Sequence, residues 1–276
     1  MNEYIFLFGL AFVYIAFAII HDFKTKEIPN WLNFSLIAFV LAYRAFYGIF
    51  SNNLMFFVYG LIGIIIFVII GYAFYYGRIF AGGDAKLLMG FGGILPYERL
   101  EDYFYIGGGF IFILFLIGSI WALIYSLFLV NKNIKKFVKE FKKELTLNKK
   151  IIYLALIFVI FLSFILFFFR IYYFLLLLLI IILLPLFYIY SRSVDNSFMV
   201  KFVSPDKLTE GDWLLKDVKI GKRVIKKTVH GLTKHDIELL RKARKKLWIR
   251  DGVPFTPAFL FALIFMIVFL LRYSLF

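Results

Sequence analysis

Long apolar runs with almost no charge constrain this chain more than any other feature. A helix that crosses a bilayer needs about 20 mainly apolar residues. Seven runs approach or exceed that length, and an eighth, Asp84–Leu95, is shorter. The seven are Tyr4–Ile20, Leu32–Phe50, Leu54–Gly77, Tyr103–Val130, Ile151–Phe169, Ile171–Ser191 and Phe255–Leu271. The pattern predicts an all-α polytopic membrane protein with about eight transmembrane helices, one of them short.

The basic residues are concentrated between these runs. Eight lysines lie within Asn131–Lys150, and sixteen Lys or Arg residues lie within Arg192–Val253. Loops rich in Lys and Arg stay on the cytoplasmic side of a membrane, so eight spans put these segments inside and both termini outside. The lysine-rich segment then suits a contact with anionic lipid. The net charge of +15 comes without a nucleic-acid-binding motif, so we expect no nucleic-acid partner.

This charge pattern divides the chain into five expected parts. Residues 1–130 form a membrane core, residues 131–150 a basic cytoplasmic loop, and residues 151–191 a transmembrane hairpin that turns at Arg170. Residues 192–253 form a small α+β cytoplasmic domain, inserted before the last transmembrane helix at 254–276. Arg44, near the end of the second apolar run, is expected to extend its side chain to the membrane surface.

Within 192–253 the sequence indicates short strands and one basic helix. The strands are expected at 198–203 and 224–225, with a turn at Gly221-Lys222. Thr233 is a good N-cap, because a threonine hydroxyl accepts hydrogen bonds from the first free backbone N–H groups of a helix. The helix is expected over Asp236–Ile249.

Two carboxylates stand at the edges of apolar runs. Asp22 follows the first run, and Asp84 precedes the short one, directly after Gly82 and Gly83. Under the predicted topology both lie at the cytoplasmic ends of their helices, at the same depth. The glycines lack a Cβ and allow a positive φ or the close approach of another backbone. The absence of cysteine removes thiol nucleophiles, disulfides and cysteine-bound metals.

Two neighbouring carboxylates can share a proton and act as a general acid–base pair. Such a pair hydrolyses an amide without a covalent intermediate, a metal or a cofactor. Structural alternatives exist for each group: Asp22 could neutralise Lys24 or Lys26, and Asp84 could cap its helix. Two other functions also stay open. One is a transporter or channel in which the aspartates bind a cation, and the other is a non-catalytic assembly platform.

The motifs around these aspartates resemble the archaeal prepilin and preflagellin peptidases, G-x-G-D intramembrane aspartyl proteases related to the bacterial prepilin peptidases. The matching segments are 22–31 (DFKTKEIPNW), 82–88 (GGDAKLL) and 250–258 (RDGVPFTPA). The first glycine of the family motif is Ala81 in this chain. The family's bacterial cysteine tetrad has no counterpart here.

The resemblance implies that Asp22 and Asp84 are the catalytic pair, with Gly82, Gly83 and Lys86 in the active-site loop. Lys86 could favour ionisation of Asp84 or could anchor its helix at the membrane surface. The implied activity is an aspartic endopeptidase in the cell membrane that needs no cofactor. Its implied substrate is a membrane-bound prepilin or preflagellin precursor, cut after a short basic leader at the cytoplasmic face.

Overall fold

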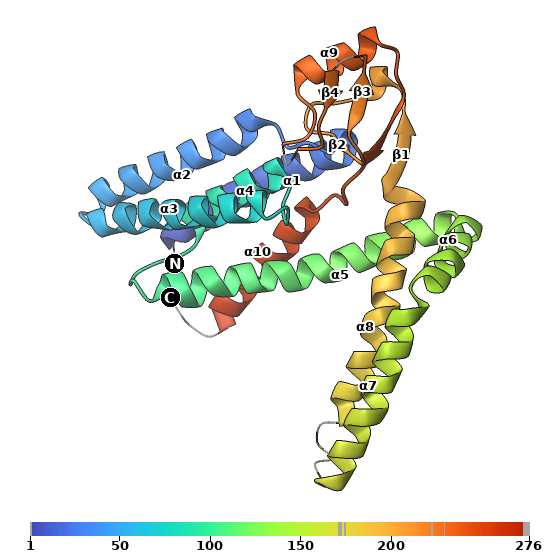
Figure 1. Ribbon diagram of the computed structural model, residues 1–276. Helices are drawn as coiled ribbons and strands as arrows, with labels where there is room; N and C mark the ends of the chain where they lie inside the picture. Colours follow the sequence, from blue (N-terminus) through green and yellow to red (C-terminus); the bar gives the residue numbers. More distant parts are fainter. Residues whose placement is uncertain (1, 171–172, 174, 222, 229, 273–276) are drawn as a thin grey trace. The chain divides into compact units, whose positions relative to one another are not determined.

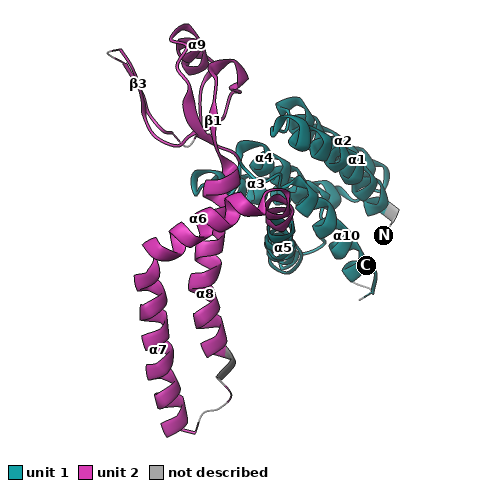
Figure 2. Ribbon diagram, turned by 90° about the vertical axis from the view of Figure 1, so that its right-hand side faces the viewer, with its two compact units in different colours: residues 1–124, 252–276 teal, residues 125–251 magenta. Residues whose placement is uncertain are grey.

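A computed structural model describes residues 2–170, 173, 175–221, 223–228 and 230–272. The chain is mostly helical and forms two compact units (Figures 1 and 2). Unit 1 contains Met1–Ile124 and Gly252–Phe276, and unit 2 contains Tyr125–Asp251.

Unit 1 is a helical membrane unit. Its helices are α1 (Asn2–Thr25), α2 (Asn30–Phe50), α3 (Leu54–Tyr76), α4 (Gly82–Ile94), the first part of α5 (Gly109–Lys132), which follows the π-helical segment Tyr103–Gly108, and α10 (Thr256–Arg272). The short helix α4 packs against α1, α2 and α3. Its residues from Leu87 to Ile94 are all buried. Helix α4 is therefore shielded by its neighbours, one of the ways in which a helix too short for the bilayer can be accommodated.

Glycines bring α3 and α4 into close backbone contact. A Cβ placed on Gly63 would lie 2.1 Å from the carbonyl oxygen of Gly92. A Cβ placed on Gly92 would lie 2.4 Å from the carbonyl oxygen of Gly63. Small residues allow membrane helices to approach in this way, which maximises van der Waals contact where no hydrophobic effect drives association. The pair fixes the position of α4, the helix that carries Asp84.

The expectation that Arg44 extends to the membrane surface is wrong. Its side chain is fully buried and donates hydrogen bonds to the carbonyl oxygens of Phe56, Gly93 and Leu95, at 2.6, 2.6 and 2.8 Å. The carbonyls of the last helical turn have no partner within their own helix. Arg44 satisfies Gly93 and Leu95 at the end of α4 and joins them to the first turn of α3. Arg44 therefore connects α2 with α3 and α4 inside the protein and does not contact the membrane surface.

Unit 2 combines a long helical hairpin with a small α/β segment. Its elements are the end of α5, α6 (Ile134–Leu147), α7 (Lys149–Phe168), α8 (Leu175–Val194), the π-helical turn Asp195–Met199, β1 (Val200–Val203), the 3₁₀ turn Pro205–Lys207, β2 (Trp213–Leu214), β3 (Val218–Ile220), β4 (Arg223–Ile225), α9 (Lys234–Lys242) and β5 (Leu247–Arg250). Helices α7 and α8 lie side by side, as a helical hairpin requires (Figure 1). Arg170, at its turn, has a φ of 55°.

The α/β segment contains an antiparallel three-stranded sheet in the order β1-β5-β2 and a separate β3-β4 pair. The predicted strands at 198–203 and 224–225 correspond to β1 and β4. Gly221 has the positive φ of a turn residue, at 57°, whereas Lys222 lies outside the described residues. A core that includes Leu214, Leu240 and Ile249 holds the segment together.

Two predictions for unit 2 need correction. The basic segment 131–150, expected as a loop, contains the helix α6. The helix expected over Asp236–Ile249 ends at Lys242 as α9, and β5 follows at Leu247–Arg250. Thr233 is the N-cap as predicted and forms a capping box with Asp236. Pairing of β5 between β1 and β2 buries Leu247 and Ile249, which outweighs the local helix propensity.

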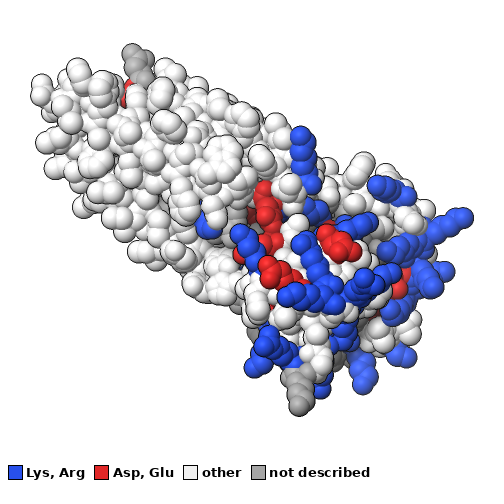
Figure 3. Space-filling model, turned by 90° about the horizontal axis from the view of Figure 1, so that it is seen from above, with Lys and Arg blue, Asp and Glu red and all other residues white. Residues whose placement is uncertain are grey.

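Six helical segments in the described part of the chain are long and apolar enough to cross a membrane. They are Glu3–Thr25, Asn30–Phe50, Leu54–Tyr76, Tyr103–Lys132, Lys149–Phe168 and Leu177–Met199. The two remaining segments that we expected to span are shorter, with 17 residues in α10 and 13 in α4. Figure 3 shows Lys and Arg gathered over the α/β segment, whereas the membrane helices in that view are almost free of charge.

Candidate active site

Asp22 lies in the last turn of α1, and the beginning of α10 holds its carboxylate. Its side chain is buried, with 7% of its surface exposed. The backbone N–H and the hydroxyl of Thr256 both donate hydrogen bonds to Oδ2 of Asp22, at 3.2 and 2.8 Å. Lys26 is near enough for its charge to act on Asp22, and its ammonium donates to the carbonyl oxygen of Gly252 at 3.4 Å. Asp22 therefore links two helices that are distant in sequence.

Asp84 lies in the first turn of α4, which packs against α1. The residue is partly buried, and its carboxylate is close enough to Asp22 for the two charges to interact. The N-cap position of α4 belongs to Ala81, without a side-chain capping bond, so Asp84 is not the cap of its helix. The structure thus brings the two aspartates together, although 61 residues separate them in the sequence.

The expected active-site loop is instead the first turn of a helix. Gly82 and Gly83 begin α4, and neither has a positive φ. Gly83 is needed for close approach, because a Cβ there would lie 3.0 Å from Cβ and 3.2 Å from the backbone nitrogen of Ile28. Ala81 has an extended conformation, with φ of −67° and ψ of 160°. Such a conformation suits any residue, so this position does not require the family's glycine.

Helix α2 holds the same turn from the other side. The side-chain amide of Asn33, a buried residue, donates to the carbonyl oxygen of Gly83 at 3.3 Å. The ammonium of Lys86 donates to Oδ1 of Asn30 at 2.6 Å and lies 5.8 Å from the centre of the Phe34 ring. These contacts favour an anchoring role for Lys86 over a direct effect on Asp84. The segment Pro29–Asn33 and the first turn of α4 form one connected structure.

Thr256 and Asn33 are site residues that the sequence does not predict. The segment containing Thr256 was part of the family resemblance, but nothing local indicates a bond to a residue 234 positions away. A threonine followed by a proline predicts the N-terminus of a helix and indicates no further contact of the threonine side chain. Asn33 lies inside an apolar run, where a single asparagine is a weak sign of a buried contact.

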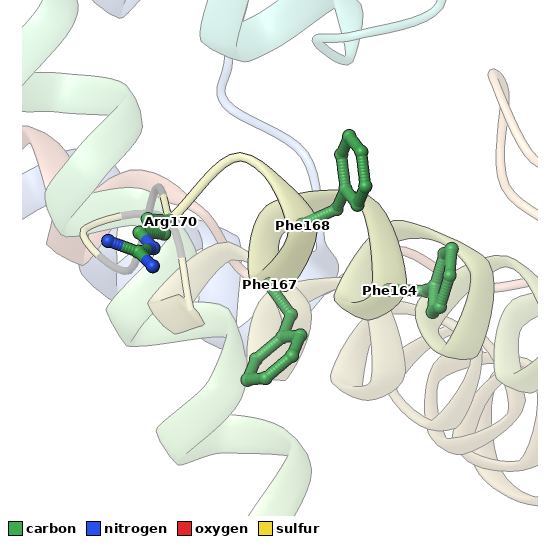
Figure 4. Close-up of a pocket in the computed structure, with 4 residues that line it drawn as sticks. All are labelled: Phe164, Phe167, Phe168 and Arg170. Carbon is green, nitrogen blue, oxygen red and sulfur yellow. The ribbon is translucent and has the colours of Figure 1, made fainter.

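A separate depression lies at the end of α7 in unit 2. It is lined by Phe164, Phe167, Phe168 and Arg170, with the three rings spread around it (Figure 4). The lining offers no carboxylate, hydroxyl or imidazole for acid–base chemistry. We therefore place the candidate active site at Asp22 and Asp84.

Comparison with known proteins finds similar sequences over the region that contains both aspartates. Residues 7–127 match Peptidase A24, the type IV leader peptidase family. The chain is 29% identical over 79 residues to a preflagellin peptidase of Methanocaldococcus jannaschii, a match that covers 29% of this chain and 33% of that protein. It is 30% identical over 146 residues to a preflagellin peptidase of Methanococcus voltae, a match that covers 49% of this chain and 61% of that protein.

The matches thus span between one third and three fifths of these relatives' lengths. No solved structure matches the chain significantly. The family match includes both Asp22 and Asp84 and the whole of α4. It agrees with the resemblance seen in the motifs: residues 7–127 of this chain are similar to the type IV leader peptidase family.

Proposed function

We propose that this protein is a membrane aspartic endopeptidase that removes the short basic leader from type IV pilin-like or preflagellin precursors. One observation carries the proposal: the region that matches the family brings Asp22 of α1 and Asp84 of α4 together at the ends of two packed helices. The relatives named preflagellin peptidase support this substrate class. The cut would fall between the basic leader and the apolar helix of the precursor.

The pair supplies a proton acceptor and a proton donor. An ionised aspartate takes a proton from water while the water oxygen bonds to the carbonyl carbon of the scissile amide. The protonated aspartate gives its proton to the carbonyl oxygen, which produces a gem-diol. In the second step, the aspartate that took a proton from water gives this proton to the amide nitrogen. A hydroxyl of the gem-diol returns a proton to the other aspartate. The C–N bond breaks, and the pair regains its starting protonation.

We further propose that α4 and α10 complete an eight-span arrangement in the cell membrane. Helix α4, at 13 residues, is about 20 Å long and needs the cover that α2 and α3 provide. In this arrangement residues 1–130 are the catalytic core and 254–276 are the last span. The basic segment 131–150 and residues 192–253 lie on the cytoplasmic side, as their Lys and Arg content favours.

Anionic lipid is a second proposed partner, bound through α6. This helix exposes an apolar strip of Ile134, Val138 and Leu145, whose exposed fractions are 57, 40 and 38%. At 100° per residue, exposed lysines at 135, 139 and 142 lie beside that strip. Apolar residues flanked by lysines are typical of helices that lie in the membrane interface and contact anionic headgroups.

A neighbouring side of α6 packs onto the end of α8. The buried carboxylate of Glu144 accepts hydrogen bonds from the amides of Asn148 and Asn196, both at 2.9 Å. The ring of Phe137 packs edge-on against Tyr190, with centroids 5.5 Å apart. Helix α6 is therefore fixed to unit 2 by one face, which leaves its apolar strip free to meet lipid.

Co-expression with a candidate precursor tests the proposed activity. Wild-type protein should convert the precursor to a faster-migrating product on a gel. Asp206→Asn, a change at an exposed aspartate, should behave like wild type. If no leader-bearing precursor is shortened while liposomes show an ion flux that stops on mutation of Asp84, the protein is a transporter and the proposal is wrong.

A further inference from the structure

The two aspartates have different hydrogen-bonding environments. Asp22 receives two hydrogen bonds from Thr256, and the backbone N–H of Phe255 also acts on it. For Asp84, the backbone of Ala81 is the neighbouring hydrogen-bonding group, and no described side chain donates to its carboxylate. Hydrogen bonds donated to a carboxylate favour its ionised form. The environments therefore separate the two residues chemically.

Helix α10 adds to this difference. Thr256 is the first residue of α10, so its N–H belongs to the end of the helix where N–H groups lack partners. The positive end of a helix dipole stabilises an anion that lies there. Thr256 is fully buried, which excludes water as a competing partner for its hydroxyl. The bond between Thr256 and Asp22 is therefore formed in a site that strengthens it.

We propose that Thr256 is a positioning residue that keeps Asp22 as the proton acceptor of the pair, so that Asp84 is the proton donor. This inference rests on the proposed peptidase function and assigns the two roles within it. Thr256 binds Oδ2 of Asp22. The hydroxyl thereby fixes the carboxylate and leaves Oδ1 as the oxygen that takes the proton from the attacking water.

The proposed chemistry follows the two steps given above with the residues now distinguished. Asp22 removes a proton from water as the new C–O bond forms, and Asp84 protonates the carbonyl oxygen. Asp22 then transfers the proton to the amide nitrogen as the C–N bond breaks, and Asp84 recovers a proton from the gem-diol. Thr256 takes no proton at any step. Its effect is on the orientation and charge of Asp22.

Two substitutions separate this role from a packing role. Thr256→Val keeps the shape and the backbone N–H but removes the hydroxyl, whereas Thr256→Ser keeps the hydroxyl and removes the methyl group. Ser119→Ala is a control in unit 1, because the Ser119 hydroxyl is exposed and donates within its own helix, to the carbonyl oxygen of Phe115. Each variant of the whole chain is purified and reconstituted into liposomes. Its cleavage of a peptide with a basic leader and an apolar helix is measured as kcat and KM.

We expect Thr256→Val to lower kcat about tenfold or more, the size expected for loss of one hydrogen bond to a charged group. KM should stay within about twofold, because the substrate does not contact Thr256 in this account. Thr256→Ser and Ser119→Ala should keep kcat within about threefold of wild type. Thermal unfolding midpoints show whether each variant is folded. If Thr256→Val does not fold, Thr256→Cys replaces it, since a thiol is a much weaker donor of similar size.

The possible results separate the inference from the proposed function. A wild-type protein that cleaves no precursor removes the function itself. A wild-type protein that cleaves, together with a Thr256→Val variant of unchanged kcat, overturns the role of Thr256 and leaves the function intact. Equal losses of kcat in Thr256→Val and Thr256→Ser also overturn it, because the methyl group and its packing would then matter more than the hydroxyl.

Discussion

Arg44 offers the most quantitative test of how α4, the helix that carries Asp84, is held in place. Its guanidinium satisfies three buried carbonyl oxygens, from Phe56, Gly93 and Leu95. It also lies 4.6 Å from the centre of the Phe56 ring, which adds a cation–π contact. Arg44→Met keeps a long unbranched side chain but removes every donor. Helix α4 would then end on carbonyl groups without partners.

The expected loss of stability follows from these contacts. Each buried acceptor left without a donor costs about 1–3 kcal/mol, so three acceptors cost about 3–9 kcal/mol. Methionine avoids burying a charge, which returns several kcal/mol. We expect a net destabilisation of about 2–4 kcal/mol. At about 2–4 °C per kcal/mol, the unfolding midpoint should fall by roughly 4–16 °C.

The assay is thermal unfolding of purified protein in one detergent, followed by tryptophan fluorescence. Arg272→Met is the matched control, because it makes the same chemical change at an exposed position at the end of α10. Its midpoint should stay close to that of wild type. Arg44→Lys should be intermediate, since one ammonium cannot reach three carbonyls in the geometry of a planar guanidinium. A midpoint for Arg44→Met equal to that of Arg272→Met would show that the hydrogen bonds of Arg44 do not hold α4 in place.

Two further predictions concern helix packing and lipid. Gly63→Ala should separate α3 from α4 and lower both the stability and the cleavage activity. Gly9→Ala is the control and should leave both unchanged, because nothing lies within 4 Å of a Cβ at that position. Equal behaviour of the two variants would contradict the close packing of α3 and α4. Native mass spectrometry should show anionic phosphatidylglycerol retained by wild type, and a triple change to glutamine at Lys135, Lys139 and Lys142 should largely remove it, since each lysine contributes about 1 kcal/mol. Retention at the wild-type level would exclude α6 as the lipid contact.

The sequence predicted the candidate aspartates because a charge at the edge of an apolar run is conspicuous without a structure. A charged side chain is costly in the hydrocarbon of a membrane, so Asp22 and Asp84 are both candidates for a functional site. The motifs around them indicate the same role. Thr256 could not be predicted as a partner, because its bond to Asp22 depends on how α10 packs against α1. The pairing of distant segments is the part of the site that local patterns leave open.

Arg44 shows why a position near the end of an apolar run does not decide a side chain's environment. The same position permits extension to the surface or insertion between helices. The outcome depends on the carbonyl groups at the end of α4, which have no sequence signal. Gly60 makes room for the buried side chain, because a Cβ there would lie 2.1 Å from Cδ of Arg44. The local sequence around Arg44 does not reveal that space.

The two errors in unit 2 have different origins. The segment Ala243–Lys246 has good helix formers, and only the pairing of β5 with β1 and β2 ends the helix early. The competition between helix and strand is decided by tertiary contacts, so the local sequence does not predict it. The local sequence does predict helix α6, because apolar residues at 134, 137, 138, 141 and 145 follow the helical period. The high lysine content favoured a loop, although lysine is a good helix former.

The proposed cleavage by the two aspartates is tested most directly by the N-terminal sequence of a purified precursor. This sequence is determined by mass spectrometry before and after exposure to the protein in liposomes. We expect one new N-terminus, at the junction between basic leader and apolar helix. We expect no such product with Asp22→Asn or with Asp84→Asn, although both variants fold. The same product at the wild-type rate from either variant would contradict the claim that these two aspartates together hydrolyse the amide.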